Sequence, residues 1–160
     1  MNGGIIPALL LCATIALMLS FTTGRVAWFS VAGMTATTAV LAQIALPQSL
    51  AAAIFVGVWA TIIVAAALTY FPPALAQRWA LPLAVVAGAG IGALASISGR
   101  KGDLLLALPA SLLFVPGRWI VARGYGLGIK IVASWMIAIA LLSTFVSLTP
   151  TPGYEPDHME

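Results

Sequence analysis

The chain has 160 residues, of which 62% are hydrophobic and only 7% are charged, and its formal net charge is +3. A soluble domain of this size could not bury so much apolar surface, so the composition excludes a water-soluble protein and predicts one all-α domain in a lipid bilayer. The cations stand in turns rather than on one clustered basic face, so we expect no nucleic-acid partner.

Apolar runs predict membrane-spanning helices along almost the whole chain. Each run is close to the ~20 residues that a helix needs to cross ~30 Å of hydrocarbon. The clearest predicted spans cover residues 4–22, 26–46, 50–71, 81–98 and 129–148. Pro47 is expected to end the second helix and Ser49 to cap the third, while Pro72–Trp79 and Gly99–Asp103 are expected to form longer connections.

The segment 104–122 allows two interpretations. Its apolar part is short, contains Pro109, and is closed by Pro116, Gly117 and Arg118. A run of that length can be a re-entrant segment, which gives five spans. If the run extends to Ala122, it can cross as a kinked helix with Arg118 snorkelling near its end, which gives six.

The placement of tryptophan favours six spans. Counting Lys and Arg on the two faces does not separate the models, because both give five against two. Three turns, however, repeat one theme: Arg25 with Trp28, Arg78 with Trp79, and Arg118 with Trp119. Only six spans, arranged as three hairpins, place all three pairs on one face. We expect a bacterial inner-membrane protein with that face in the cytoplasm and the acidic, flexible tail 151–160 in the periplasm.

Two helices are predicted to carry a smooth face of small residues. Ala84, Gly88, Gly92 and Ser96 recur at every fourth position of the fourth span, and Gly57, Thr61, Ala65 and Thr69 do so in the third. Helices in lipid associate through close packing, and small residues let their backbones approach. We expect these faces to pack on each other, on a second copy in a homo-oligomer, or on a larger membrane partner protein.

Residues able to perform chemistry are scarce. The single histidine, His158, lies in the tail, and the single cysteine, Cys12, cannot form an internal disulfide, so we expect no metal and no cofactor. Asp103 follows Gly102, a pair that resembles part of the GxGD motif of membrane aspartyl peptidases, but the spans hold no second acid. No nucleophile–base pair is present in the spans either, so we do not expect an enzyme.

A few polar and charged residues remain as candidates for a substrate path. Hydroxyl groups in the spans, Ser111 among them, are expected to bond the carbonyl one turn back. Gln43 cannot do so as easily and lies near the interface. Asp103 and Lys130 stand at the edges of apolar runs, and Arg123 follows the 104–122 segment.

The element Pro109-Ala-Ser-Leu-Leu-Phe-Val-Pro116-Gly117 resembles the P-x(5–6)-P-G element of the small subunits of split threonine/serine exporters, which are compact multi-span proteins. The resemblance covers this element alone, and the chain has an additional apolar run before it. It implies a helix break at Pro109, Pro116 and Gly117, and broken helices expose backbone groups that transporters use to bind solutes.

The sequence thus yields two functional hypotheses. The leading one is a small transport protein, either a permease or the membrane subunit of a transporter or exporter complex. The alternative is a non-catalytic accessory or assembly subunit of a larger membrane complex, which accounts for the sparsely polar interior and the smooth helix faces.

Overall fold

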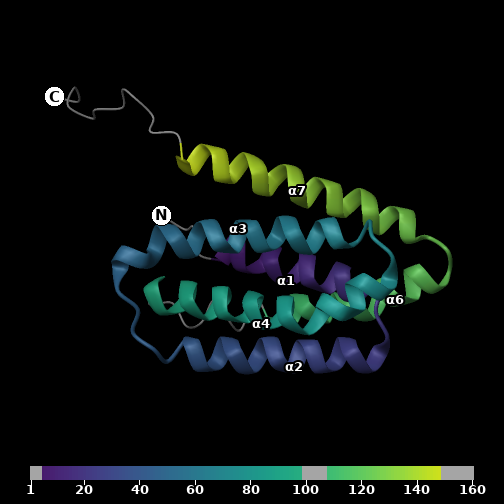
Figure 1. The fold of residues 1–160 in the computed structure, drawn as a ribbon, viewed down its shortest axis with the longest axis horizontal. Coiled ribbons are helices and arrows are strands. Elements are labelled where there is room, and N and C mark those ends of the chain that lie inside the picture. Colours follow the sequence, from purple (N-terminus) through teal and green to yellow (C-terminus); the bar gives the residue numbers. More distant parts are fainter. Residues whose placement is uncertain (1–4, 99–107, 149–160) are drawn as a thin grey trace.

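A computed structural model describes residues 5–98 and 108–148, and within these residues the chain is all-helical, without strands (Figure 1). Its α-helices, in chain order, are α1 (Ile5–Leu19), α2 (Gly24–Leu41), α3 (Ala51–Leu68), α4 (Pro73–Ser98), α6 (Phe114–Ala122) and α7 (Gly126–Leu148). Two 3₁₀ helices lead directly into the helices that follow them: η1 (Gln48–Leu50) precedes α3, and η2 (Leu108–Leu113) precedes α6.

The helices form three antiparallel hairpins, α1–α2, α3–α4 and α6–α7, whose turns lie at the same end of the bundle (Figure 1). Three helical stretches are long and apolar enough to cross a membrane: Gln48–Leu68, Pro73–Ile97 and Gly126–Val146. The apolar stretches Ile6–Leu19 and Leu108–Ala122 are shorter. A helical bundle compatible with a membrane protein is therefore confirmed, whereas six separate crossings are not.

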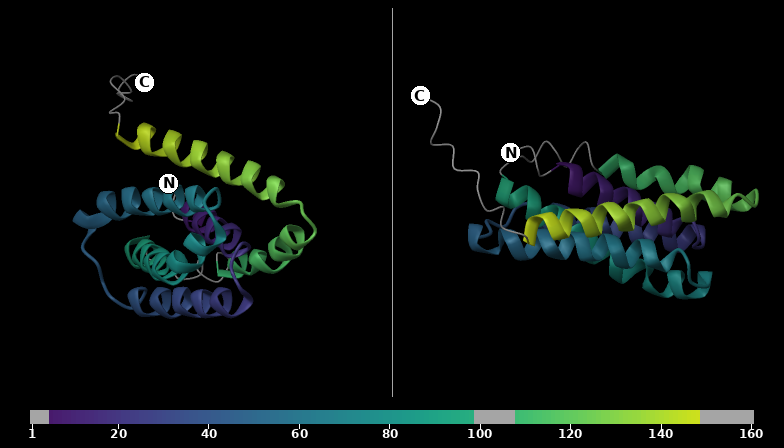
Figure 2. Two further views of the ribbon diagram at one scale, coloured as in Figure 1. Left: turned by 45° about the vertical axis from the view of Figure 1, so that its right-hand side comes forward. Right: turned by 90° about the horizontal axis from the view of Figure 1, so that it is seen from above.

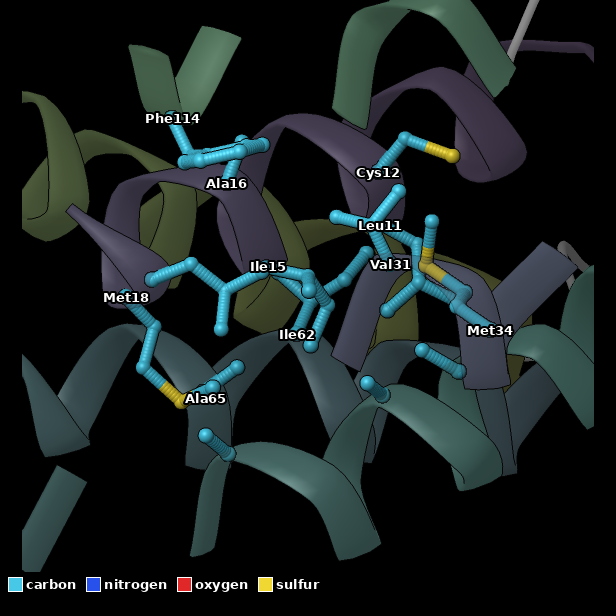
Figure 3. Packing of buried hydrophobic residues seen from close by; sticks show 14 of the residues in the cluster. Leu11, Cys12, Ile15, Ala16, Met18, Val31, Met34, Ile62, Ala65 and Phe114 are labelled. Atoms are coloured by element: carbon cyan, nitrogen blue, oxygen red, sulfur yellow. The ribbon is translucent and has the colours of Figure 1, made fainter. Parts of the chain in front are cut away.

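Helix α1 is the centre of the bundle. It packs against α3, α4, η2, α6 and α7, and no residue from Pro7 to Ser20 is exposed (Figures 1 and 2). The sequence of α1 is apolar on every side, which is typical of a fully enclosed helix. Leu11, Ile15 and Met18 are completely buried and project toward side chains of the neighbouring helices (Figure 3). The core is therefore organised around the first helix of the chain.

The closest helix pair is α2 with α4, and the small face of α4 explains it. A Cβ built on Gly88 would lie within 3.0 Å of the Met34 carbonyl oxygen, and one on Gly92 would lie 2.7 Å from the carbonyl oxygen of Thr38. Ala84 on the same face is fully buried. The small face of α4 therefore packs closely on α2, a partner that was not among those expected from the sequence. Helix α3 also packs on α4, but less extensively.

Helix α7 lies at the periphery. Ala133 and Ala140 are fully buried on the side that packs on α3, while most of its large side chains are exposed. Trp135, Leu142 and Phe145, for example, each expose more than 60% of their surface. Such a helix has a narrow protein-facing stripe and a broad apolar surface, which suits contact with lipid acyl chains.

Two helix boundaries differ from the expectation because of proline. The segment expected to connect the third and fourth spans is mostly helical, since α4 begins at Pro73 rather than near Leu81. Proline is favourable at the first helical position, where its missing N–H has no helical acceptor. The expected helix break at Pro116 and Gly117 is also wrong: α6 continues through both residues, and the change from 3₁₀ to α occurs earlier, at Leu113–Phe114.

Candidate functional site

Two of the predicted path residues, Pro109 and Ser111, line a pocket between α2 and η2. Its volume is about 320 Å³, and its walls also include Val31, Thr35 and Leu112. Ser111 is 2% exposed and donates a hydrogen bond to the Leu108 carbonyl at 2.7 Å. Thr35 donates to the Val31 carbonyl within its own helix. The α2–η2 pocket is therefore mainly apolar, with two hydroxyl groups at its wall.

The two prolines shape this pocket through the backbone. Proline has no N–H, so Pro116 cannot supply the bond that the Leu112 carbonyl would receive in a regular α-helix. Directly before α6 the chain is wound as 3₁₀ over Leu108–Leu113, with Pro109 as the second residue of this segment. Pro116 is tolerated because it stands in the first turn of α6, directly after the 3₁₀ segment. The predicted irregularity is thus present at η2, before Pro116 rather than at it.

Gly117 and Arg118 hold α6 against the α1–α2 turn. Gly117 is buried, and a Cβ at this position would collide with the hydroxyl of Ser20 at the end of α1. Arg118 is half-buried, and its guanidinium lies beside Gly24, the first residue of α2: a Cβ built there would be 2.7 Å from Nη1. Both residues therefore pack at a helix junction, away from the residues that line the α2–η2 pocket.

Arg123 and Lys130 flank the α6–α7 turn and pair with aromatic residues. The Arg123 guanidinium lies 3.7 Å from the centroid of the Trp119 ring, a cation–π contact. Lys130 lies near Tyr70, whose hydroxyl donates a 2.6 Å hydrogen bond to the Lys130 carbonyl and links α3 to α7. The turn itself is closed at Gly124, which has a φ of 86° and bonds of the kind found in Schellman motifs.

The hairpin turns gather all five cations of the described residues at one end of the bundle, which we call the basic end (Figure 1). Its members are Arg25, Arg78, Arg118, Arg123 and Lys130. Gln43 follows α2 at the opposite end, so it is not brought near them. Asp103 lies outside the described residues.

Gly57 belongs to a second hollow, which we call the α3–α4 groove. This groove has a volume of about 330 Å³ and lies between α3, α4 and the end of α2. Thr61, Val86 and Gly90 are among its other lining residues. Gly57 is exposed, and a Cβ built on it would meet nothing within 4 Å. The small face of α3 is therefore partly uncovered in the single chain.

Hydroxyl groups mostly behave as predicted, but several also make contacts that the sequence did not reveal. Thr38 donates to the Met34 carbonyl one turn back and also lies 3.0 Å from the Gly88 carbonyl of α4. Ser96 donates to the Ile44 carbonyl and accepts from the Leu46 amide. The contact between α2 and α4 has one signal in the sequence: Met34 and Thr38 stand one turn apart on α2, and α4 is rich in glycine.

The described part of the interior contains few groups that could ligate a metal ion. No group of three or more His, Cys, Asp or Glu side chains there could hold a metal ion. Cys12 is buried in α1. Two buried polar atoms in these ranges, Ser30 Oγ and Trp59 Nε1, have no hydrogen-bond partner. They lie on α2 and α3, two helices that do not pack closely on each other.

Comparison with known proteins does not assign the chain to a family: no family model, no curated protein and no solved structure matches it. The arguments for a function therefore rest on the residues and their geometry alone.

Proposed function

We propose that this chain is a small integral membrane transport protein, acting as an oligomeric permease or as the membrane subunit of a transporter complex. The observation that carries the proposal is the α2–η2 pocket. It is lined by Pro109 and Ser111 of the element that resembles small exporter subunits, and it lies where regular helical bonding is interrupted. Interrupted helices at membrane depth are a common place for solute binding in transporters.

The pocket bounds the class of substrate. Its volume of about 320 Å³ is at the lower end of the range for small-molecule sites. The wall is mainly apolar, with the hydroxyl groups of Thr35 and Ser111 and no charged side chain among its described lining residues. These properties suit a small, weakly polar or zwitterionic solute better than an ion.

The orientation follows from the basic end. Because Lys and Arg accumulate on the cytoplasmic side of bacterial inner-membrane proteins, we place the basic end in the cytoplasm. The three hairpins then cross as six spans, with α1 enclosed by the other helices and η2–α6 packed on α1 at the surface of the bundle, and the C-terminus is periplasmic.

Transport can be tested in reconstituted vesicles. Efflux is measured from proteoliposomes loaded with radiolabelled serine or threonine, because the element 109–117 resembles that of threonine/serine exporters. Thr35→Leu fills the pocket and is expected to abolish flux. Ala36→Leu adds a larger side chain at the neighbouring, exposed position of α2 and is expected to preserve it. Equal flux in both variants would show that the solute does not pass through the α2–η2 pocket.

A second function, that of an accessory subunit, is favoured by the α3–α4 groove. The groove leaves Gly57 and part of a small-residue helix face uncovered, a surface suited to a helix of another membrane protein. Gly57→Leu should then release a stoichiometric partner during native purification. Gly128→Leu is the control, because Gly128 is equally unobstructed but lies outside the groove. Release by neither variant would argue against this role.

A further inference from the structure

The basic end concentrates positive charge, and no Asp or Glu lies among the described residues. All five Lys and Arg residues within 5–98 and 108–148 lie there, whereas all four Asp and Glu residues of the sequence fall outside those ranges. No described helix carries an acid in its first turn. Charge of this density at a membrane face attracts anions from the surroundings.

Two hydrogen bonds connect the hairpins at this surface. Gln77 of α4 donates to the Thr23 hydroxyl in the α1–α2 turn at 3.5 Å. Tyr70 at the end of α3 donates to the Lys130 carbonyl in α7. These two bonds connect the helix ends on which the cations lie: Gln77 precedes Arg78 in α4, and Lys130 itself accepts the second bond.

Arg118 has an unusual position within this surface. Its guanidinium lies against Gly24 at the amino end of α2, with Nη1 and Nη2 2.7 and 3.5 Å from the position of a Cβ there. The amino end of a helix carries partial positive charge, and the next residue is Arg25. The Arg118 guanidinium is therefore repelled by Arg25 and by the amino end of α2, and a bound anion would offset this repulsion. A guanidinium offers a fork of donors that matches a phosphate group.

Exposed aromatic side chains accompany the cations. Trp28, Trp79 and Trp119 are each about half exposed or more, and Tyr125 exposes 69% of its surface. Arg123 stacks on Trp119. Amphipathic rings of this kind favour the headgroup level of a bilayer, so the depth of the basic end matches the depth of lipid phosphates.

We propose that the basic end binds the headgroup of an anionic phospholipid, with Arg118 as its principal contact at the junction of α6 with the α1–α2 turn. The phosphodiester accepts hydrogen bonds from the guanidinium and offsets the positive potential of Arg25 and the α2 amino end. The aromatic side chains flank the glycerol region. This site is separate from the α2–η2 pocket and does not depend on transport.

The test is lipid binding to the purified full chain in detergent. Phosphatidylglycerol or phosphatidylcholine is added, and bound lipid is counted by native mass spectrometry. We expect the unmodified chain to retain phosphatidylglycerol preferentially. Arg118→Gln should weaken that binding about fivefold, since one basic residue near an anionic surface contributes roughly such a factor. Lys130→Gln also removes one positive charge from the basic end, but Lys130 lies on α7 beside Tyr70 rather than at the junction, so this variant should weaken binding less.

A second variant keeps the test valid if Arg118→Gln does not fold. Gly24→Ala retains every charge, but its methyl group displaces the guanidinium from its place, so it should also weaken lipid binding. Equal retention of the two lipids by the unmodified chain would overturn the proposal, as would equal effects of Arg118→Gln and Lys130→Gln. Inorganic phosphate should not displace the lipid, and full displacement by phosphate would refute a lipid-specific site.

Discussion

At the scale of single residues, glycine decides how closely the helices approach. Gly88 and Gly92 face backbone atoms of α2 at distances that no side chain could occupy, whereas Gly57 and Gly128 face open space. A glycine inside a helix costs about 0.5–1 kcal/mol relative to alanine, so a glycine at a close contact serves packing rather than helix formation. The same residue type therefore has opposite roles on different helices.

Gly88→Ala is expected to destabilise the bundle, because the added methyl group would overlap the Met34 carbonyl and force α2 away from α4. The overpacking cost is on the order of 1–3 kcal/mol. Gly128→Ala should be neutral or slightly stabilising, since it meets no atom within 4 Å and favours helix. Thermal unfolding of the two variants in detergent measures the difference. Equal melting temperatures would contradict the close approach.

At the scale of helices, side chains near helix ends join consecutive hairpins. Ser96, near the end of α4, is bonded to both the Ile44 carbonyl and the Leu46 amide in the α2–α3 connection. Gln48 of η1 reaches the Ile97 carbonyl beside it. The connection that precedes α3 is therefore secured to α4 at the end of the bundle opposite to the basic end.

Ser96→Ala should remove both bonds and release the connection, at a cost of about 0.5–1.5 kcal/mol for each bond. The readout is hydrogen exchange at the Leu46 amide, which should become faster. Ser134→Ala is a matched control, because the Ser134 hydroxyl bonds only the Ile131 carbonyl of its own helix. Unchanged exchange at Leu46 after Ser96→Ala would show that the connection is held in another way.

Individual helices were easier to predict than their partners. An apolar run is a local signal, so α2, α3 and α7 could be located from the sequence. The pairing of α4 with α2 could not, because the sequence indicated small-residue faces only on α3 and α4, and only the folded bundle shows that α2 lies against the face of α4. The beginning of α4 was missed because Pro73 suggests a loop as readily as a helix start. Thr35 was missed as a pocket residue because its hydroxyl is bonded within its own helix.

At the scale of the whole molecule, the three hairpins place their turns at one end, which gives a direct test of topology. In six spans, cysteines at Ala74 and Tyr125 lie on the same side of the membrane, whereas five spans place them on opposite sides. With Cys12 changed to alanine, an impermeant maleimide should leave both positions unlabelled in intact cells and label both after permeabilisation. A cysteine at Ser49 should be labelled in intact cells. Labelling of Ala74→Cys alone in intact cells would support five spans.

The central position of α1 has a consequence for biogenesis. Among the described helices α1 is made before the rest, and the helices that pack on it, including α3, α4 and α7, all follow it in the chain. Its native contacts therefore form over large separations in sequence, which slows folding. Until α7 has been made, α1 lies in the membrane without all of its final neighbours, and the bundle is completed only when the later helices pack around it.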